Sequence, residues 1–163
     1  MRFRKNTLKT IVAGICSTLI AIGFGRFIYT PILPDMQSSL NFSSTTMGII
    51  SSYNYLGYLI GSMISVLAKF QNLRNLVIFS SLISSISICL MGLSSDIKFF
   101  VFLRFLCGVS SAFGFVYTIS LMFNEFEKSD NKSYQLIHFC GIGLGISVGT
   151  FLVWLLSIYQ FDW

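Results

Sequence analysis

Gly23-Phe24-Gly25-Arg26-Phe27-Ile28-Tyr29-Thr30-Pro31 places an arginine inside an apolar stretch that begins at Thr10 and continues past Tyr29. This stretch is long enough to cross a hydrocarbon core of about 30 Å as a helix, and it lacks a small-x-small cleavage site. It therefore predicts a retained first membrane span rather than a signal peptide. Arg26 needs a partner there, because an arginine in mid-membrane costs roughly 2.5–3.5 kcal/mol on insertion scales.

The composition of the whole chain agrees with this interpretation. Of its 163 residues, 54% are hydrophobic and 10% are charged, and the mean hydropathy is +0.76. A soluble domain carries about 25% charged residues. The sequence predicts an all-α, polytopic transmembrane helix bundle that fills the chain as a single incomplete unit. Its five expected spans cover approximately residues 10–33, 46–68, 74–93, 98–123 and 134–159.

The distribution of basic residues predicts topology and excludes a nucleic-acid partner. The net charge is +5, but Arg2, Arg4, Lys5 and Lys9 all precede the first span. Residues 34–45, which form the next connection, contain no Lys or Arg. Because cytoplasmic loops carry the excess of basic residues, we expect the N-terminus in the cytoplasm.

The four cysteines lie within apolar spans and show no CxxC or Cys/His ligand spacing. We interpret them as small packing residues, with neither a disulfide nor a metal site, and we expect no cofactor. They are Cys16, Cys89, Cys107 and Cys140.

Two spans carry small residues at four-residue spacing. The second span has Gly57 and Gly61, and the fifth has Gly141, Gly145 and Gly149. Such rows let helix backbones approach closely, so we predict helix packing at these glycines. The alternative is that these faces slide during a transport cycle.

Arg26 and Arg104 are the permanently charged residues that lie well inside predicted spans. Arg26 lies about 25 Å along the helix from Lys9, and Arg104 lies about 10 Å from the outer surface, so both fall in the outer third of the membrane. Each arginine could cap backbone carbonyls or extend to the surface. Alternatively, Arg26 faces a central cavity and meets an anionic solute or an acid outside this chain.

Other polar side chains in the spans have two interpretations each. Asn54, Tyr55, Tyr58 and Tyr117 could line a cavity, although tyrosines also anchor helices at the membrane interface. His138 could relay protons near neutral pH, or it could be a hydrogen-bonded packing residue.

One enzymatic alternative rests on Ser110 and His138. Gly108-Val109-Ser110 and His138-Phe139-Cys140-Gly141 resemble the serine and histidine helices of rhomboid intramembrane proteases. A GxS element is expected by chance in a helix rich in serine and glycine, and no oxyanion donors can be identified. We therefore expect no enzyme.

Four stretches together resemble a transporter family. Arg104-Phe105-Leu106-Cys107-Gly108 resembles the fourth-helix motif of the major facilitator superfamily (MFS). Three more resemble its YbfB-like branch, known mainly as uncharacterised transporters: residues 25–34 (GRFIYTPILP), 53–61 (YNYLGYLIG) and 138–146 (HFCGIGLGI). The resemblance implies alternating-access solute transport in a bacterial inner (plasma) membrane, with Arg26 and Asn54 in one wall of a central site.

The chain departs from the superfamily pattern in informative ways. Its loop between the second and third spans lacks the usual acidic motif, and its fifth span lacks the Gly-Pro pair of antiporters. Family members have twelve helices in two halves, and Phe161-Asp162-Trp163 resembles the start of the sixth helix. The resemblance thus implies the N-terminal part of a longer transporter of a small, unidentified solute. The alternative is a truncated or non-transporting membrane protein that assembles with other subunits.

Overall fold

The computed structural model describes residues 5–68, 70–127 and 132–159, and these contain helices and connecting turns but no strand. The predicted all-α fold class is confirmed. Arg2, Arg4, Lys69, Lys128 and Phe161–Trp163, on which parts of the topology and family predictions rest, lie outside the described residues. The elements are α1 (Lys5–Thr18), the π-helix η1 (Leu19–Phe27), α2 (Tyr29–Leu40), α3 (Ser44–Leu67), α4 (Leu73–Met91), α5 (Ile97–Phe126), the 3-10 helix η2 (Lys132–Phe139) and α6 (Cys140–Ile158).

Several of these helices are long and apolar enough to cross a membrane. Among the described residues, four qualify on both counts: Thr7–Leu40, Leu73–Met91, Ile97–Phe126 and Ser133–Ile158. The 24-residue α3 is long enough, but its serines, tyrosines and Asn54 lower its hydropathy. The chain is therefore a multi-pass integral membrane protein.

The first helix is longer than the predicted span, which stopped near residue 33. The helix continues past Pro31 to Leu40. Pro31 is the third residue of α2, a position in the first helical turn at which proline is tolerated. Asn41, with φ of 51°, then ends α2 in the left-handed conformation that asparagine tolerates. Ser43 begins α3 by accepting a hydrogen bond from the Thr46 amide at 3.1 Å.

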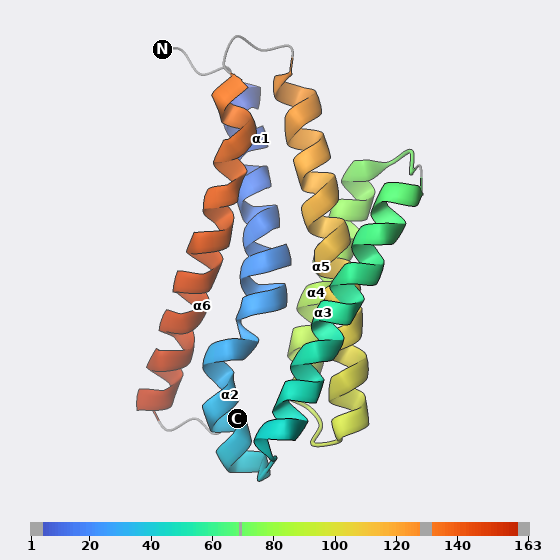
Figure 1. Ribbon diagram of the computed structural model, residues 1–163. Coiled ribbons are helices and arrows are strands. Elements are labelled where there is room, and N and C mark those ends of the chain that lie inside the picture. The colour runs from blue at the N-terminus through green and yellow to red at the C-terminus, as the bar shows by residue number, and fades with distance from the viewer. Residues whose placement is uncertain (1–4, 69, 128–131, 160–163) are drawn as a thin grey trace.

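The helices form two groups joined through α5 and η1. In Figure 1, α3 and α4 lie beside α5, whereas α6 runs along α1. At one end of the bundle, apolar side chains from α2, α3, α4 and α5 form a core cluster. A smaller cluster of Ile11, Met122 and Phe126 closes the opposite end, where α1 meets α5. This arrangement places the middle of the first helix between α5 and α6.

Candidate functional site

Glycines bring α3 and α5 into backbone contact near the middle of the bundle. A Cβ added at Gly108 would lie 2.9 Å from the Tyr58 nitrogen and closer still to the Asn54 carbonyl oxygen. Gly57 and Gly61 on α3 lie in the same way against the Phe105 and Val109 carbonyls of α5. Because these glycines have no side chain, the backbones of α3 and α5 can approach each other closely, and the neighbouring side chains of the two helices lie close together.

Asn54 ties the two helices together at this contact. It is 1% exposed, and its Nδ2 donates to the Arg104 carbonyl oxygen at 3.0 Å. Its Oδ1 is buried and has no hydrogen-bond partner. Asn54 therefore fixes the backbone of α5 at the residue that carries the second arginine.

Arg104 extends from α5 toward the first helix. Its side chain is 3% exposed, its Cζ lies 4.4 Å from the ring centroid of Tyr29, and its Nη2 donates to the Arg26 carbonyl oxygen at 3.5 Å. Its Nε has no partner. The contact to a carbonyl agrees with one of the two roles that the sequence left open for this arginine.

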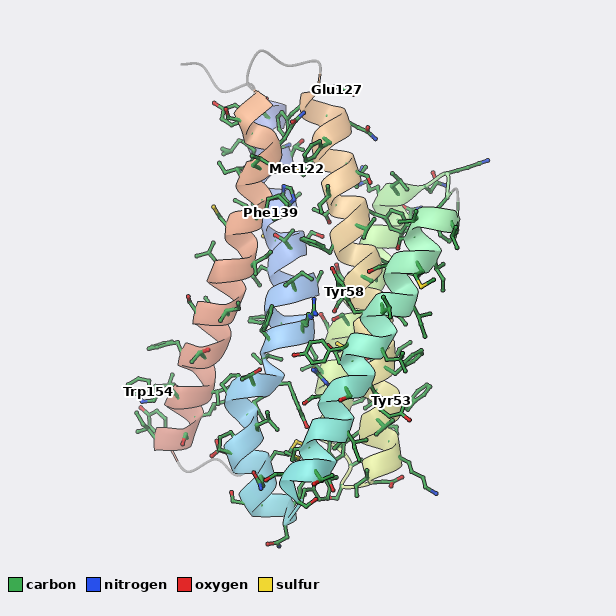
Figure 2. All side chains as sticks on the ribbon, in the orientation of Figure 1. Tyr53, Tyr58, Met122, Glu127, Phe139 and Trp154 are labelled. Atoms are coloured by element: carbon green, nitrogen blue, oxygen red, sulfur yellow. The ribbon has the colours of Figure 1, made fainter. Side chains whose placement is uncertain are left out.

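Arg26 lies at the end of η1 and meets aromatic rings of α3. Its Cζ lies 4.3 Å from the ring centroid of Tyr58 and 5.1 Å from that of Tyr55, distances at which a cation is attracted to the ring face. Figure 2 labels Tyr58 midway along the bundle, between α1 and α3. The half-buried Arg26 has an Nε without a partner. Rings, rather than carbonyls or the membrane surface, therefore surround this charge.

Neither guanidinium has a carboxylate partner among the described residues. The nearest acids in sequence are Asp35 to Arg26 and Asp96 to Arg104, each more than two helical turns away. A guanidinium offers five N–H donors in a planar fork that matches carboxylate and phosphate groups. The half-buried Arg26 thus has N–H donors with which it could hold an anion, whereas Arg104 is 3% exposed and enclosed by its neighbours.

Tyr117, the fourth polar residue predicted to line a cavity, lies among other rings and not at Arg26. Tyr117 is buried, its ring meets those of Phe70 and Phe113, and its hydroxyl has no partner. A cavity of about 790 Å³ lies instead between α1, α4 and α5. In the described part of the chain, the residues that line it include Lys9, Arg74 and Glu125 but none of the predicted site residues.

His138, in η2, contacts the first helix at a point far from Arg26. It is 0% exposed, its Nδ1 lies 2.7 Å from the Gln135 carbonyl oxygen, and its own carbonyl accepts from Thr18 Oγ1 at 2.5 Å. An added Cβ at Gly14 would lie 3.2 Å from His138 Cβ and 2.7 Å from Met122 Sδ, so the three residues meet. Gly14 and Arg26 are twelve residues apart, or about 18 Å along the helix.

The same contacts separate Ser110 from His138. Ser110 Oγ donates to the Leu106 carbonyl oxygen of its own helix at 2.8 Å. Met122, which lies beside His138, is twelve residues further along α5, or about 18 Å. The serine and histidine of the protease alternative are therefore not brought together.

The glycine row of α6 lies against the first helix. An added Cβ at Gly145 would lie 2.7 Å from the Gly23 Cα, and one at Gly149 would lie 2.8 Å from Ile28 Cδ1. Gly141 is equally close to the Ile15 carbonyl and the Thr18 hydroxyl. The row therefore seats α6 on α1 and η1.

Sequence reasoning missed two residues of this region. Cys107, interpreted only as a packing residue, directs its Sγ at the Gly25 carbonyl oxygen at 3.0 Å. Tyr29 supplies the ring on which Arg104 stacks. The spacing of Arg104 and Cys107 puts them on one face of a helix, a signal that could have linked the cysteine to the arginine.

Comparison with known proteins agrees with the expected family. A family model described as "Uncharacterised MFS-type transporter YbfB" matches residues 18–162. The chain belongs to this YbfB family of MFS-type transporters. Membership of the YbfB family establishes solute transport at the level of the family, and the resemblance noted in the four sequence stretches is confirmed.

Two curated relatives of this YbfB-family chain carry the names of a multidrug resistance protein and of a transporter. "Multidrug resistance protein 2" of Bacillus subtilis (strain 168) is 29% identical over 110 residues, which cover 66% of this chain and 27% of that protein. "Uncharacterized transporter mfc1" of Schizosaccharomyces pombe (strain 972 / ATCC 24843) is 24% identical over 146 residues, or 89% of this chain and 29% of that protein. The chain thus spans less than a third of either relative's length. No solved structure matches.

Proposed function

We propose that this chain forms part of a secondary transporter that moves a small anionic solute by alternating access. Arg26 meets the anionic group of the solute, and Asn54, Tyr58 and Arg104 form the adjoining wall. In such transporters the solute site lies near the bilayer midplane between two repeats of the fold. The other wall belongs to a C-terminal half that completes the transporter.

The observation that carries this proposal is the environment of Arg26. Its guanidinium lies over Tyr58 and Tyr55, its Nε is unpaired, and no acid lies within two turns of it in sequence. Stacking uses the face of the guanidinium and leaves N–H donors at its edge. A carboxylate or phosphate group can accept two of these donors at once, which makes it a stronger ligand than a neutral solute.

The remaining parts of the proposal concern setting and secondary roles. The transporter resides in a bacterial inner (plasma) membrane with its N-terminus in the cytoplasm, and it performs no enzymatic chemistry. We assign helix packing to Gly57, Gly61, Gly141, Gly145 and Gly149. His138 is a hydrogen-bonded packing residue rather than a proton relay, because its Nδ1 already contacts a backbone carbonyl and no acid is near it in sequence.

An uptake assay tests the proposal. The transporter that contains this chain is produced in membrane vesicles, and initial uptake rates are measured for a panel of anionic, neutral and cationic solutes. We expect an anion to be transported, Arg26→Lys to retain part of the rate, and Arg26→Ala to lose at least about tenfold, the loss of one hydrogen bond to a charged group.

The matched control is Arg74→Gln, which removes an exposed basic residue at the start of α4. Equal amounts of each variant in the membrane, measured by immunoblot, exclude a folding defect. The proposal would be overturned if the transported solute were a cation and Arg26→Ala took it up at the rate of the unmodified transporter.

A second candidate function is a non-transporting membrane protein that assembles with another subunit. It is favoured by the unpaired Nε donors of Arg26 and Arg104, for which another subunit could supply the partner. The test is to purify the 163-residue chain alone in detergent and measure its molar mass by light scattering, with reconstitution into liposomes for transport. Assembly into larger species supports this candidate, and a stable monomer that transports a solute contradicts it.

A further inference from the structure

The middle of the first helix has an uncommon backbone geometry. Residues Leu19–Phe27 form a π-helix nine residues long, between the α-helical segments α1 and α2. Most π-helices are single turns, and they occur frequently at functional sites. Gly23 and Gly25 lie within this segment. The first helix therefore runs on through these segments, while its backbone hydrogen bonds change from the α to the π pattern at Leu19 and back to the α pattern at Tyr29.

Pro31 removes one backbone donor just beyond the π segment, which ends at Phe27. In a π-helix each carbonyl accepts from the amide five residues later, so the carbonyl of Arg26 would need the amide of residue 31. That residue is Pro31, which has no N–H. The Arg26 carbonyl consequently lacks a backbone donor in this register, and the polypeptide makes a turn at Ile28 before α2 begins.

Side chains of α5 donate to two carbonyls at the end of η1, and Pro31 removes the π-register donor of one of these carbonyls, that of Arg26. Arg104 Nη2 donates to the Arg26 carbonyl at 3.5 Å, and Cys107 Sγ donates to the Gly25 carbonyl at 3.0 Å. The two donors lie three residues apart on one face of α5, and the two carbonyls are consecutive. Both bonds are weak, because one is at the distance limit and a thiol is a poor donor.

The segments on either side of η1 both contact α6 but otherwise pack in different parts of the bundle. On one side, α1 packs with α5, α6 and η2. On the other side, α2 packs through Tyr29 and Met36 into the apolar cluster that includes Met47 and Phe100. A bend at η1 would thus move α2 relative to α1 without unfolding either helix.

We propose that η1 is a hinge on which α2 swings relative to α1, and that Cys107 and Arg104 are the positioning residues that hold it in the observed state. The hinge opens and closes the end of the bundle that carries α2. This inference concerns the backbone of the first helix, and it stands or falls separately from anion binding at Arg26.

Hydrogen–deuterium exchange, read by mass spectrometry on the full chain in detergent micelles, tests the hinge. In the unmodified chain, amides of residues 24–32 exchange faster than those of residues 10–18 and 33–40. Cys107→Ala accelerates exchange in residues 24–32 by about two- to tenfold, the range expected for one lost hydrogen bond. Cys107→Ser keeps a donor and leaves exchange near the level of the unmodified chain.

Two further variants keep the test decisive. Cys89→Ala, at an exposed cysteine of α4, is the matched control and leaves exchange in residues 24–32 unchanged. Pro31→Ala supplies the missing amide and therefore slows exchange there, an effect opposite in sign to that of damage to the fold. Three results would each overturn the proposal. They are equal amide protection along residues 10–40 of the unmodified chain, an equal increase in exchange in all helices of Cys107→Ala, and faster exchange of residues 24–32 in Pro31→Ala.

Discussion

Gly108→Ala tests the contact on which the candidate site is built. The added Cβ would lie 2.9 Å from the Tyr58 nitrogen and 3.0 Å from the Asn54 carbonyl carbon, with the Asn54 carbonyl oxygen closer still. These are backbone atoms, which cannot rotate away as a flexible side chain does, so α3 and α5 must separate. Overpacking of this kind costs about 1–3 kcal/mol. Alanine recovers about 0.5–1 kcal/mol through its helix propensity.

The expected net loss is therefore about 2 kcal/mol in the free energy of unfolding, since the contact atoms place the overpacking cost in the upper part of its range. The assay is unfolding of the purified chain by SDS in mild detergent, followed by circular dichroism. Gly48→Ala, on the same helix as Tyr58, is the matched control because its added Cβ meets nothing within 4 Å. If Gly108→Ala were as stable as Gly48→Ala, the close approach of α3 and α5 would be refuted.

Two further predictions concern buried polar groups of the same region. Asn54→Ala removes the 3.0 Å hydrogen bond to the Arg104 carbonyl and should lower the free energy of unfolding by about 0.6–1.7 kcal/mol, the range measured between membrane helices; Ser52→Ala, at an exposed serine of α3, should be neutral in the same unfolding assay. N-ethylmaleimide should modify Cys107 last, because it is buried whereas the other three cysteines are exposed; mass spectrometry that found Cys107 among the first sites modified would contradict the packing at η1.

The helical architecture could be predicted because each span carries its own signal. Apolar length marks the spans, and glycines at four-residue spacing mark the faces that pack. The end of the first helix was harder, because Pro31 stops a helix only when it falls beyond the first turn. Here a new α-helical segment begins at Tyr29, so the proline is tolerated and the helix reaches Leu40.

The surroundings of the two arginines could be predicted only in part. The lack of nearby acids was evident from the sequence, and it predicted that each charge needs another kind of partner. Which partner it meets depends on how α3 and α5 are rotated about their axes, and that rotation is set by the contacts of Gly57 and Gly108. Two carbonyls of the π-helix, those of Gly25 and Arg26, likewise meet side-chain donors from a helix almost eighty residues later in the chain, which a local sequence pattern does not reveal.

The most direct test of the central claim is a binding measurement on Arg26. Isothermal titration calorimetry on the purified transporter, with the best anion from the uptake panel, gives Kd for the unmodified protein, for Arg26→Lys and for Arg26→Gln. We predict that Arg26→Gln raises Kd by about tenfold or more, as expected for a lost charged hydrogen bond, and that Arg26→Lys raises it less. An unchanged Kd in Arg26→Gln would show that the anion binds elsewhere and would contradict the proposed role of Arg26.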